Sequence, residues 1–280
     1  MDDLLCYSSS LEQHLSDEKE VLAILLQEKL YVKASKCAFG HAELGFLGHR
    51  VSGAGVSVDP RKVAAVRDWP TPPSNVELRQ FVGLCNYYRC FVNGYANIAA
   101  PLTRLCGPHA PWHWGPGEQQ SFDALKAALT SAPVLRVWDP ARPTRLLTDA
   151  SQLAVSAILE QPDDAGVYHP VAFESRKLTP PERLYPPHLL ELLAVVHALK
   201  TLRLYLLDKP FELHTDNASL QWLPEQRHLS AHQARWLHLL AEFKYKVVHI
   251  PGRVNPTDFL TRKRFPDRRV CLTGEIIHNP

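Results

Sequence analysis

The sequence lacks the features that would support a zinc site, a disulfide framework or a membrane span. Its six cysteines include no Cys-x-x-Cys pair, and no spacing of cysteine and histidine completes a zinc site. No apolar run approaches the length of a membrane span, and the chain opens on acidic residues instead of the apolar core of a signal peptide. We therefore expect free thiols in a reducing compartment, and an intracellular protein of the cytoplasm or nucleus without a membrane partner.

An excess of charge of one sign is also missing. Lysine and arginine total 31 against 29 aspartates and glutamates, so the overall charge alone predicts no nucleic-acid partner. Basic residues do gather locally, at residues 176–177 and 262–269. Such clusters are usually solvated surface, and phosphate contact is the less frequent alternative. With 280 residues and 45% hydrophobic content, the chain is an ordinary globular sequence, long enough for one large domain or two.

What the sequence does contain is one short phrase that occurs twice: an apolar run that stops at Thr-Asp. The first copy is residues 146–151 (LLTDAS) and the second is residues 213–219 (LHTDNAS). An apolar strand that ends on an aspartate places its carboxylate at the edge of a sheet, where substrate can reach it. A turn or a helix cap would explain one such aspartate. Two copies that flank a helix carrying Glu191 favour a shared site.

The pattern of predicted elements changes near residue 132. Before it the sequence predicts a strand at residues 4–7, helices at 10–29, 59–69, 74–91 and 118–130, short strands within 43–51, and a Pro/Gly-rich connector at 103–117. After it the sequence predicts strands at 134–135, 144–148, 155–159, 171–173, 211–215 and 243–250, helices at 186–206 and 230–242, and a short helix from Pro256. This second half is typical of a mixed α/β layered domain.

Four acidic residues of the second half stand where packing alone does not explain them. Asp149 and Asp216 end strands, Glu191 lies in an apolar helix where a carboxylate is costly to bury, and Asp258 opens the last helix. A turn, an exposed helix position and a first-turn acid are the structural alternatives. Converging carboxylates repel one another unless a divalent cation holds them, and oxygen ligands favour Mg²⁺ or Mn²⁺. Two such ions would suit phosphodiester cleavage.

A series of short blocks carries a family resemblance. In chain order they are DD (2–3), KCAF (36–39), FLGH (46–49), LRQFVGLCNYYR (78–89), FDALK (122–126), APVL (132–135), TDAS (148–151), ELLAVV (191–196), TD (215–216) and PGRVNPTDFLTR (251–262). The series resembles the C-terminal part of the reverse transcriptase in gypsy-type LTR-retrotransposon and retroviral Pol polyproteins. Each block is modest alone, but their order is specific, and the resemblance extends from residue 1 to about residue 263.

The resemblance implies a fold with defined parts. The α/β RNase H-like domain is expected to have three layers and a mixed sheet, with the strands that end in Asp149 and Asp216 adjacent and parallel. The implied parts are a partial reverse-transcriptase palm (1–55), a helical thumb/connection (56–117), a linking helix (118–132), the RNase H-like domain (133–263) and a basic tail (264–280). We expect the chain from residue 1 to about 117 to be less compact than the second half.

The resemblance also implies an activity. The family cleaves the RNA strand of RNA–DNA hybrids and leaves a 3′-hydroxyl. Carried over residue by residue, it assigns the binding of two Mg²⁺ or Mn²⁺ ions to Asp149, Glu191, Asp216 and Asp258. These are the four carboxylates that the pattern of strands and helices selects independently.

The sequence departs from the family in two places. Asp2 and Asp3 would be half of a vestigial polymerase metal site, and because the third polymerase aspartate belongs upstream of Met1, we expect no primer extension. Val155 and Ser156 stand where the family has glycines, so we expect crowding in the first hairpin of the second half. Two hypotheses remain: an active metal-dependent ribonuclease H, or a catalytically silent protein that binds hybrids or serves as a scaffold. The intact set of four acidic residues favours the ribonuclease, which we take as the expected function, whereas the missing polymerase half favours the alternative.

Overall fold

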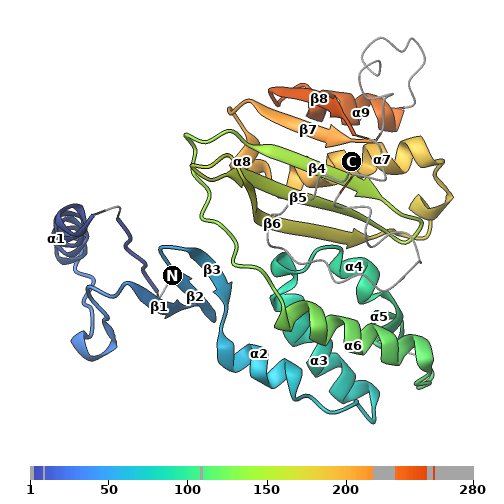
Figure 1. Ribbon diagram of the computed structural model, residues 1–280, viewed down its shortest axis with the longest axis horizontal. Coiled ribbons are helices and arrows are strands. Elements are labelled where there is room, and N and C mark those ends of the chain that lie inside the picture. Colours follow the sequence, from blue (N-terminus) through green and yellow to red (C-terminus); the bar gives the residue numbers. More distant parts are fainter. Residues whose placement is uncertain (1–2, 9, 108–109, 217–230, 251–254, 256–280) are drawn as a thin grey trace, which may run out of the picture.

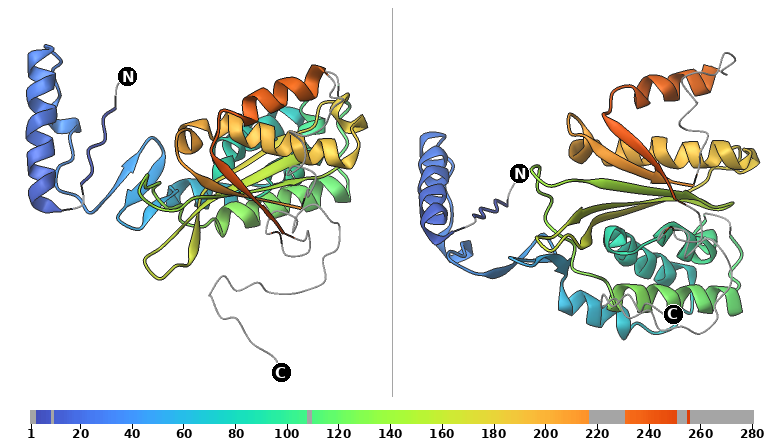
Figure 2. Two further views of the ribbon diagram at one scale, coloured as in Figure 1. Left: turned by 90° about the horizontal axis from the view of Figure 1, so that it is seen from above. Right: turned by 45° about the horizontal axis from the view of Figure 1, so that its top comes forward.

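The computed structural model describes residues 3–8, 10–107, 110–216, 231–250 and 255, except for the side chains of residues 231 and 232. Within these residues the chain forms a small three-stranded sheet and a large five-stranded sheet. The large sheet lies between two layers of helices, whereas the first helix stands apart from both sheets (Figures 1 and 2).

The large sheet is mixed, as predicted. Its strands are β4 (Arg145–Ala150), β5 (Ala154–Pro162), β6 (Tyr168–Lys177), β7 (Phe211–Thr215) and β8 (Tyr245–His249), and their spatial order is β6-β5-β4-β7-β8. The β4–β5 and β5–β6 pairs are antiparallel, and the β4–β7 and β7–β8 pairs are parallel. Strand β4 carries Asp149 and β7 ends just before Asp216. The predicted parallel pairing of these two strands is therefore confirmed.

One face of the large sheet is covered by helices from the same half of the chain, which are seen above the sheet in the right view of Figure 2. They are α7 (Pro187–Thr201), α8 (Arg203–Leu206) and α9 (Ala231–Leu240). Leu146 and Leu213 of the sheet share one buried cluster with Leu192 and Leu199 of α7. The helix predicted over residues 186–206 is interrupted at Leu202, which separates α7 from α8.

The other face of the large sheet is covered by helices that precede it in the sequence (Figure 2). They are α3 (Asn75–Tyr87), the 3₁₀ turn η2 (Arg89–Phe91), α4 (Tyr95–Ile98), α5 (Ala100–Leu105) and α6 (Pro116–Thr130). Leu147, Ile158 and Phe173 of the sheet pack in a second buried cluster with Phe81 and Phe122 of these helices. Successive side chains of a strand point to opposite faces, so adjacent residues of β4 serve different clusters.

The three layers therefore draw on both halves of the chain. In the part that the structure describes, the second helical layer comes from residues 75–130, which the sequence assigns to the thumb/connection and the linking helix. The limits of the expected domains stay a prediction. The packing does establish that residues before 133 are needed to bury the second face of the RNase H-like sheet.

Helix beginnings agree with the signals in the sequence. Asp59 caps α2 (Pro60–Arg67) by accepting a backbone N–H over 2.8 Å, and proline occupies the first helical position. Glu118 closes the start of α6 by accepting the N–H of Gly115 over 3.1 Å. These local interactions satisfy backbone groups that a helix leaves without partners.

The N-terminal region, which we define as residues 3–58, packs far less than the rest. Its elements are α1 (Leu11–Gln27), the 3₁₀ turn η1 (Ala34–Lys36), and strands β1 (Glu43–Phe46), β2 (His49–Ser52) and β3 (Gly55–Val58), which form the small antiparallel sheet. Helix α1 buries no residue. The strand predicted at residues 4–7 is wrong: this segment is coil and pairs with no strand in the described part of the chain. The expected looseness up to residue 117 holds only for this region, because residues of α3 and α5 are fully buried.

A β-bridge outside the named strands ties the small sheet to the chain that leads into the large one. Val56 and Leu135 exchange two backbone hydrogen bonds of 2.8 Å each. Gly55 has a φ of +131°, and a Cβ there would lie 2.1 Å from the carbonyl oxygen of Leu135, so the close approach requires glycine. The strand predicted at residues 134–135 is this one bridge and extends no further.

The expected crowding at Val155 and Ser156 does not occur. Both residues lie in regular antiparallel pairs, Val155 opposite Ala150 and Ser156 opposite Asp149. Val155 is fully buried in the cluster beneath α7. A β-branched side chain suits this position because it fills the space between sheet and helix.

Two expectations concern the C-terminal end of the chain. The short helix from Pro256 and the basic tail at 264–280 both lie outside the described residues. Among the helices that the structure does describe, none combines the length and the apolar character needed to cross a membrane.

Candidate metal centre

Three carboxylates meet at one edge of the large sheet. Asp149 is near the end of β4, Asp216 directly follows β7, and Glu191 lies in the first turns of α7. Because β4 and β7 are parallel neighbours, their carboxyl ends fall at the same edge. One oxygen from each of the three residues lies within 4.8 Å of the others. Asp149 is buried, and the other two are half-buried.

The electrostatics of the cluster disfavour three separate negative charges. Burial, followed by the charges of Asp216 and Asp149, raises the pKa of Glu191 to about 9, although a hydrogen bond from the Ala150 backbone works against the rise. Glu191 Oε2 and Asp216 Oδ1 are buried and have no hydrogen-bond partner within the described ranges of the chain. Buried oxygens in this condition destabilise the fold unless something neutralises them.

The donor set fits a hard divalent cation. All three residues offer carboxylate oxygens, which are the ligands that Mg²⁺ and Mn²⁺ prefer. Oxygens on opposite sides of a Mg²⁺ ion lie about 4.2 Å apart, because each is about 2.1 Å from the ion. Binding would therefore draw the three oxygens, which lie within 4.8 Å of one another, slightly closer together.

The remaining predicted acids are not part of this cluster as described. Asp258 and Asp2 lie outside the described residues. Asn255, three residues before Asp258 in the sequence, is buried, and its Nδ2 donates to the carbonyl oxygen of Thr148 in β4 over 3.0 Å. Asp3 is exposed and belongs to no group of possible metal ligands within the described part of the chain.

A group of cations lies at the same sheet edge, two strands away from β4. Lys177, the last residue of β6, donates from Nζ to Thr103 Oγ1 of α5 over 2.8 Å. Burial, and then the charges of Arg183 and Arg104, lower the pKa of Lys177. We call Lys177, Arg104 and Arg183 the basic cluster. Strand register places Asp149 in line with Ser156 and Ser175, and Lys177 lies two residues further along β6. Two strand spacings of about 4.8 Å and a shift of two residues of about 3.3 Å each put the backbone of Lys177 roughly 12 Å from that of Asp149.

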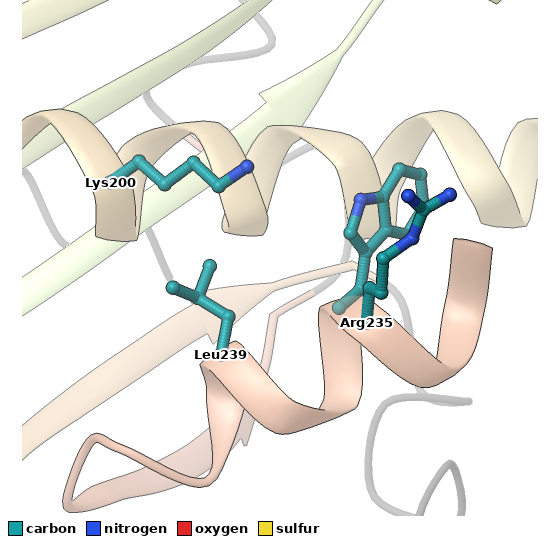
Figure 3. Close-up of a pocket in the computed structure, with 4 residues that line it drawn as sticks. Lys200, Arg235 and Leu239 are labelled. Carbon is teal, nitrogen blue, oxygen red and sulfur yellow. The ribbon is translucent and has the colours of Figure 1, made fainter. Parts of the chain in front are cut away.

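A separate hollow lies between α7 and α9 (Figure 3). Its lining consists of Lys200, Arg235, Trp236 and Leu239, with no carboxylate among them. Lys200 follows Glu191 by nine residues, which is roughly 13 Å along the helix axis. The hollow is therefore distinct from the carboxylate cluster and offers no ligand for a hard cation.

The sequence pattern selects the carboxylates but not the residues that gather beside them. Asp149, Glu191 and Asp216 stand out by their places at strand ends and in an apolar helix, and the structure brings these three together. The sequence pattern does not reveal the basic cluster, because its members lie far apart in the chain. Arg104 belongs to α5, in the helical layer that precedes the sheet, whereas Lys177 ends β6. Only the pair at 176–177 gave a signal, and that signal is usually a solvated surface.

Comparison with known proteins relates the chain to reverse transcriptases. Residues 139–243 match the family described as the RNase H-like domain found in reverse transcriptase. The chain is 36% identical over 264 residues to the retrovirus-related Pol polyprotein from transposon 297 of Drosophila melanogaster, covering 94% of this chain and 24% of that protein. It is 34% identical over 263 residues to the transposon Tf2-3 polyprotein of Schizosaccharomyces pombe, covering 91% of this chain and 19% of that protein. The chain thus spans a quarter or less of these relatives.

Solved structures show the same fold. The foamy viral protease-reverse transcriptase in complex with an RNA/DNA hybrid aligns with a TM-score of 0.71 and 22% identity, over 97% of this chain and 37% of that one. The same type of protein in complex with double-stranded DNA aligns with a TM-score of 0.70 and 24% identity, over 88% of this chain and 52% of that one. Both alignments extend well beyond the large sheet, so the helices that precede the sheet share the arrangement.

Proposed function

We propose that this chain, a relative of retrotransposon Pol polyproteins, is a metal-dependent ribonuclease H. The premise is that its residues 139–243 form the RNase H-like domain of a reverse transcriptase. Its substrate is the RNA strand of an RNA–DNA hybrid. The observation that carries the proposal is the meeting of Asp149, Glu191 and Asp216 within 4.8 Å at one sheet edge.

The positions of the carboxylates suggest their roles. Asp149 is proposed as the central ligand, and with Glu191 and Asp216 it would hold one Mg²⁺ or Mn²⁺ ion. Asp258 would contribute to a second ion. Bound divalent ions supply an activated water and stabilise the leaving oxygen. The protein holds these oxygens at a partly buried edge of the sheet. Their mutual repulsion there favours the binding of a cation.

The basic cluster suits a polyanionic substrate. Its three cations form no ion pair with a carboxylate in the described part of the chain, so their charge is available to phosphates. Phosphates of one strand succeed one another by about 3.4 Å along a duplex axis. A cluster whose Lys177 backbone is roughly 12 Å from that of Asp149 would contact the substrate backbone a few nucleotides from the cleaved bond. The foamy viral protein of similar fold was solved with an RNA/DNA hybrid, which supports the choice of substrate.

A gel assay tests the proposal. A hybrid with labelled RNA is incubated with the protein and Mg²⁺, with EDTA, or with Ca²⁺, and a parallel hybrid carries the label on its DNA strand. We expect RNA cleavage with Mg²⁺ only, products that end in a 3′-hydroxyl, and an intact DNA strand. Ca²⁺ should permit binding without cleavage, because its looser coordination misplaces the water.

Two outcomes would contradict this function. Cleavage that continues in EDTA would show that the carboxylates do not act through a cation. Tight hybrid binding in Mg²⁺ without cleavage would favour the alternative, a catalytically silent protein that binds hybrids or serves as a scaffold.

A further inference from the structure

The turn after Asp149 is held by a residue from the other helix layer. Ser151, two residues after Asp149, accepts the backbone N–H of Ala154 over 2.9 Å and so shapes the β4–β5 turn. The same hydroxyl lies 3.1 Å from Oδ1 of Asn97 and 2.9 Å from the carbonyl oxygen of Ala154, and its one proton can be donated to either acceptor. Asn97 belongs to α4, which covers the opposite face of the sheet from Glu191.

Helix α4 is itself firmly placed. The N–H of Ala96 donates to Oγ of Ser175 in β6 over 2.9 Å, in a buried contact. On its other side, the hydroxyl of Ser121 in α6 donates to the carbonyl oxygen of Ile98. The short helix is thus bonded to the sheet on one side of Asn97 and to α6 on the other, and it lies between them in Figure 1. A side chain of α4 is therefore fixed in position relative to the sheet and to α6.

The choice of asparagine at position 97 is not explained by packing. Its Nδ2 is buried and has no hydrogen-bond partner among the residues that the structure describes, which costs folding free energy. An alanine or leucine would avoid that cost at a position whose only purpose was to fill space. The contact with Ser151 is what the carboxamide provides.

We infer that Asn97 is a positioning residue for the metal centre, acting through Ser151 on the turn that fixes Asp149. The inference rests on the proposed function and extends it: the helices before residue 133 help to set how tightly the carboxylates hold a divalent ion. Metal ligands must be held to within a few tenths of an ångström, so a loosened turn is enough to weaken the site.

A double-mutant cycle on metal binding tests the inference. Mn²⁺ binding is titrated by calorimetry in the absence of nucleic acid for the parent chain, Asn97→Ala, Ser151→Ala and the double variant. We expect each single substitution to weaken Mn²⁺ binding about tenfold, as residues that orient metal ligands do. The double variant should be no weaker than Ser151→Ala, because both changes break the same contact. Hybrid binding in Ca²⁺ and the thermal midpoint should change little in comparison.

Matched variants keep the outcomes apart. Asn86→Ala, at an exposed asparagine of α3, should leave Mn²⁺ binding at the parental value. If Asn97→Ala does not fold, Asn97→Ser takes its place in the cycle, since its shorter side chain cannot reach Ser151. Parental Mn²⁺ binding in the folded Asn97 variant, or additive losses in the double variant, would overturn the inference. Parental Mn²⁺ binding in Asp149→Asn would instead overturn the proposed metal site.

Discussion

The N-terminal region and the sheet region, which comprises the described residues from 59 to 255, carry similar apolar patterns but use them differently. In α1 the leucines at the apolar positions remain in solvent, with Leu11 at 68% and Leu26 at 70% exposure. In α7 the corresponding Leu192 and Leu199 are at 2% and 0%. Apolar spacing therefore marks a face that can be covered, and the free energy of burial is gained only where another layer lies against it.

The same contrast separates the acidic residues that the sequence singled out. Asp149 is buried near the end of β4, within reach of Glu191 and Asp216, and Asp3 is exposed on a coil. A carboxylate becomes chemically distinctive when its surroundings exclude water and bring like charges close. Four predictions test this contrast, from the largest expected effect to the smallest.

The first prediction compares the two cores. Phe81 is fully buried and its ring lies 4.5 Å from that of Phe122, so Phe81→Ala should lower the free energy of unfolding by about 3–5 kcal/mol. Leu26→Ala should change it by less than about 0.5 kcal/mol, as expected for an exposed side chain. Urea denaturation monitored by circular dichroism measures both. A large loss at Leu26 would show that α1 is covered in solution and would break the comparison.

The second prediction concerns activity. Asp149→Asn keeps the size of the side chain and removes its charge, so the fold should survive while hybrid cleavage falls at least about a hundredfold, roughly 2.7 kcal/mol of barrier. Asp3→Asn should cleave at the parental rate, because Asp3 lies in no carboxylate group of the described residues. Single-turnover rates at saturating hybrid provide the measurement. Equal rates for the parent and Asp149→Asn would refute the site.

The third prediction is a pH dependence. The folded protein raises the pKa of Glu191 to about 9 from an ordinary value of 4.5, so between these values the folded state retains a proton that the unfolded state has lost. Metal-free stability should therefore be complete below about pH 4.5 and should fall as the pH rises towards 9. Glu191→Gln remains neutral and should exceed the parent by at least about 1 kcal/mol at pH 8 in EDTA.

Thermal unfolding of the parent and of Glu191→Gln in matched buffers measures the direction of this stability difference. The advantage of Glu191→Gln should vanish at pH 4 and shrink when Mg²⁺ is added, because the parent then gains stability from binding. A variant that is less stable than the parent at pH 8 in EDTA would show that Glu191 is charged and compensated without metal.

The fourth and smallest effect concerns substrate binding. Lys177→Ala removes one cation of the basic cluster and should weaken hybrid binding about threefold, with a loss of about one unit in the slope of log affinity against log salt. Lys19→Ala, on exposed α1, should leave both quantities unchanged. Fluorescence anisotropy over a salt series in Ca²⁺ measures them. Identical slopes for the two variants would exclude the basic cluster from phosphate contact.

Local patterns in the sequence determined most of the elements of the large sheet and one edge of that sheet. The Thr-Asp endings of β4 and β7 and the placement of Glu191 in an apolar helix were sufficient to select the three carboxylates that meet. This selection is possible because the periodicity of a strand or a helix can be recognised within a few residues. In addition, the ends of neighbouring parallel strands lie at the same edge of a sheet. Asp258 remains a prediction from the same kind of signal.

Only the tertiary structure decided which surfaces are covered and which distant residues meet. The second helical layer, the exposed face of α1, the basic cluster and the contact of Asn97 with Ser151 all depend on elements far apart in the chain; this last pair is separated by 54 residues. A short stretch of sequence indicates whether a residue can lie on an apolar face or donate a hydrogen bond. It does not record the partner, because the partner is selected by the packing of whole layers and by the long-range register of strands.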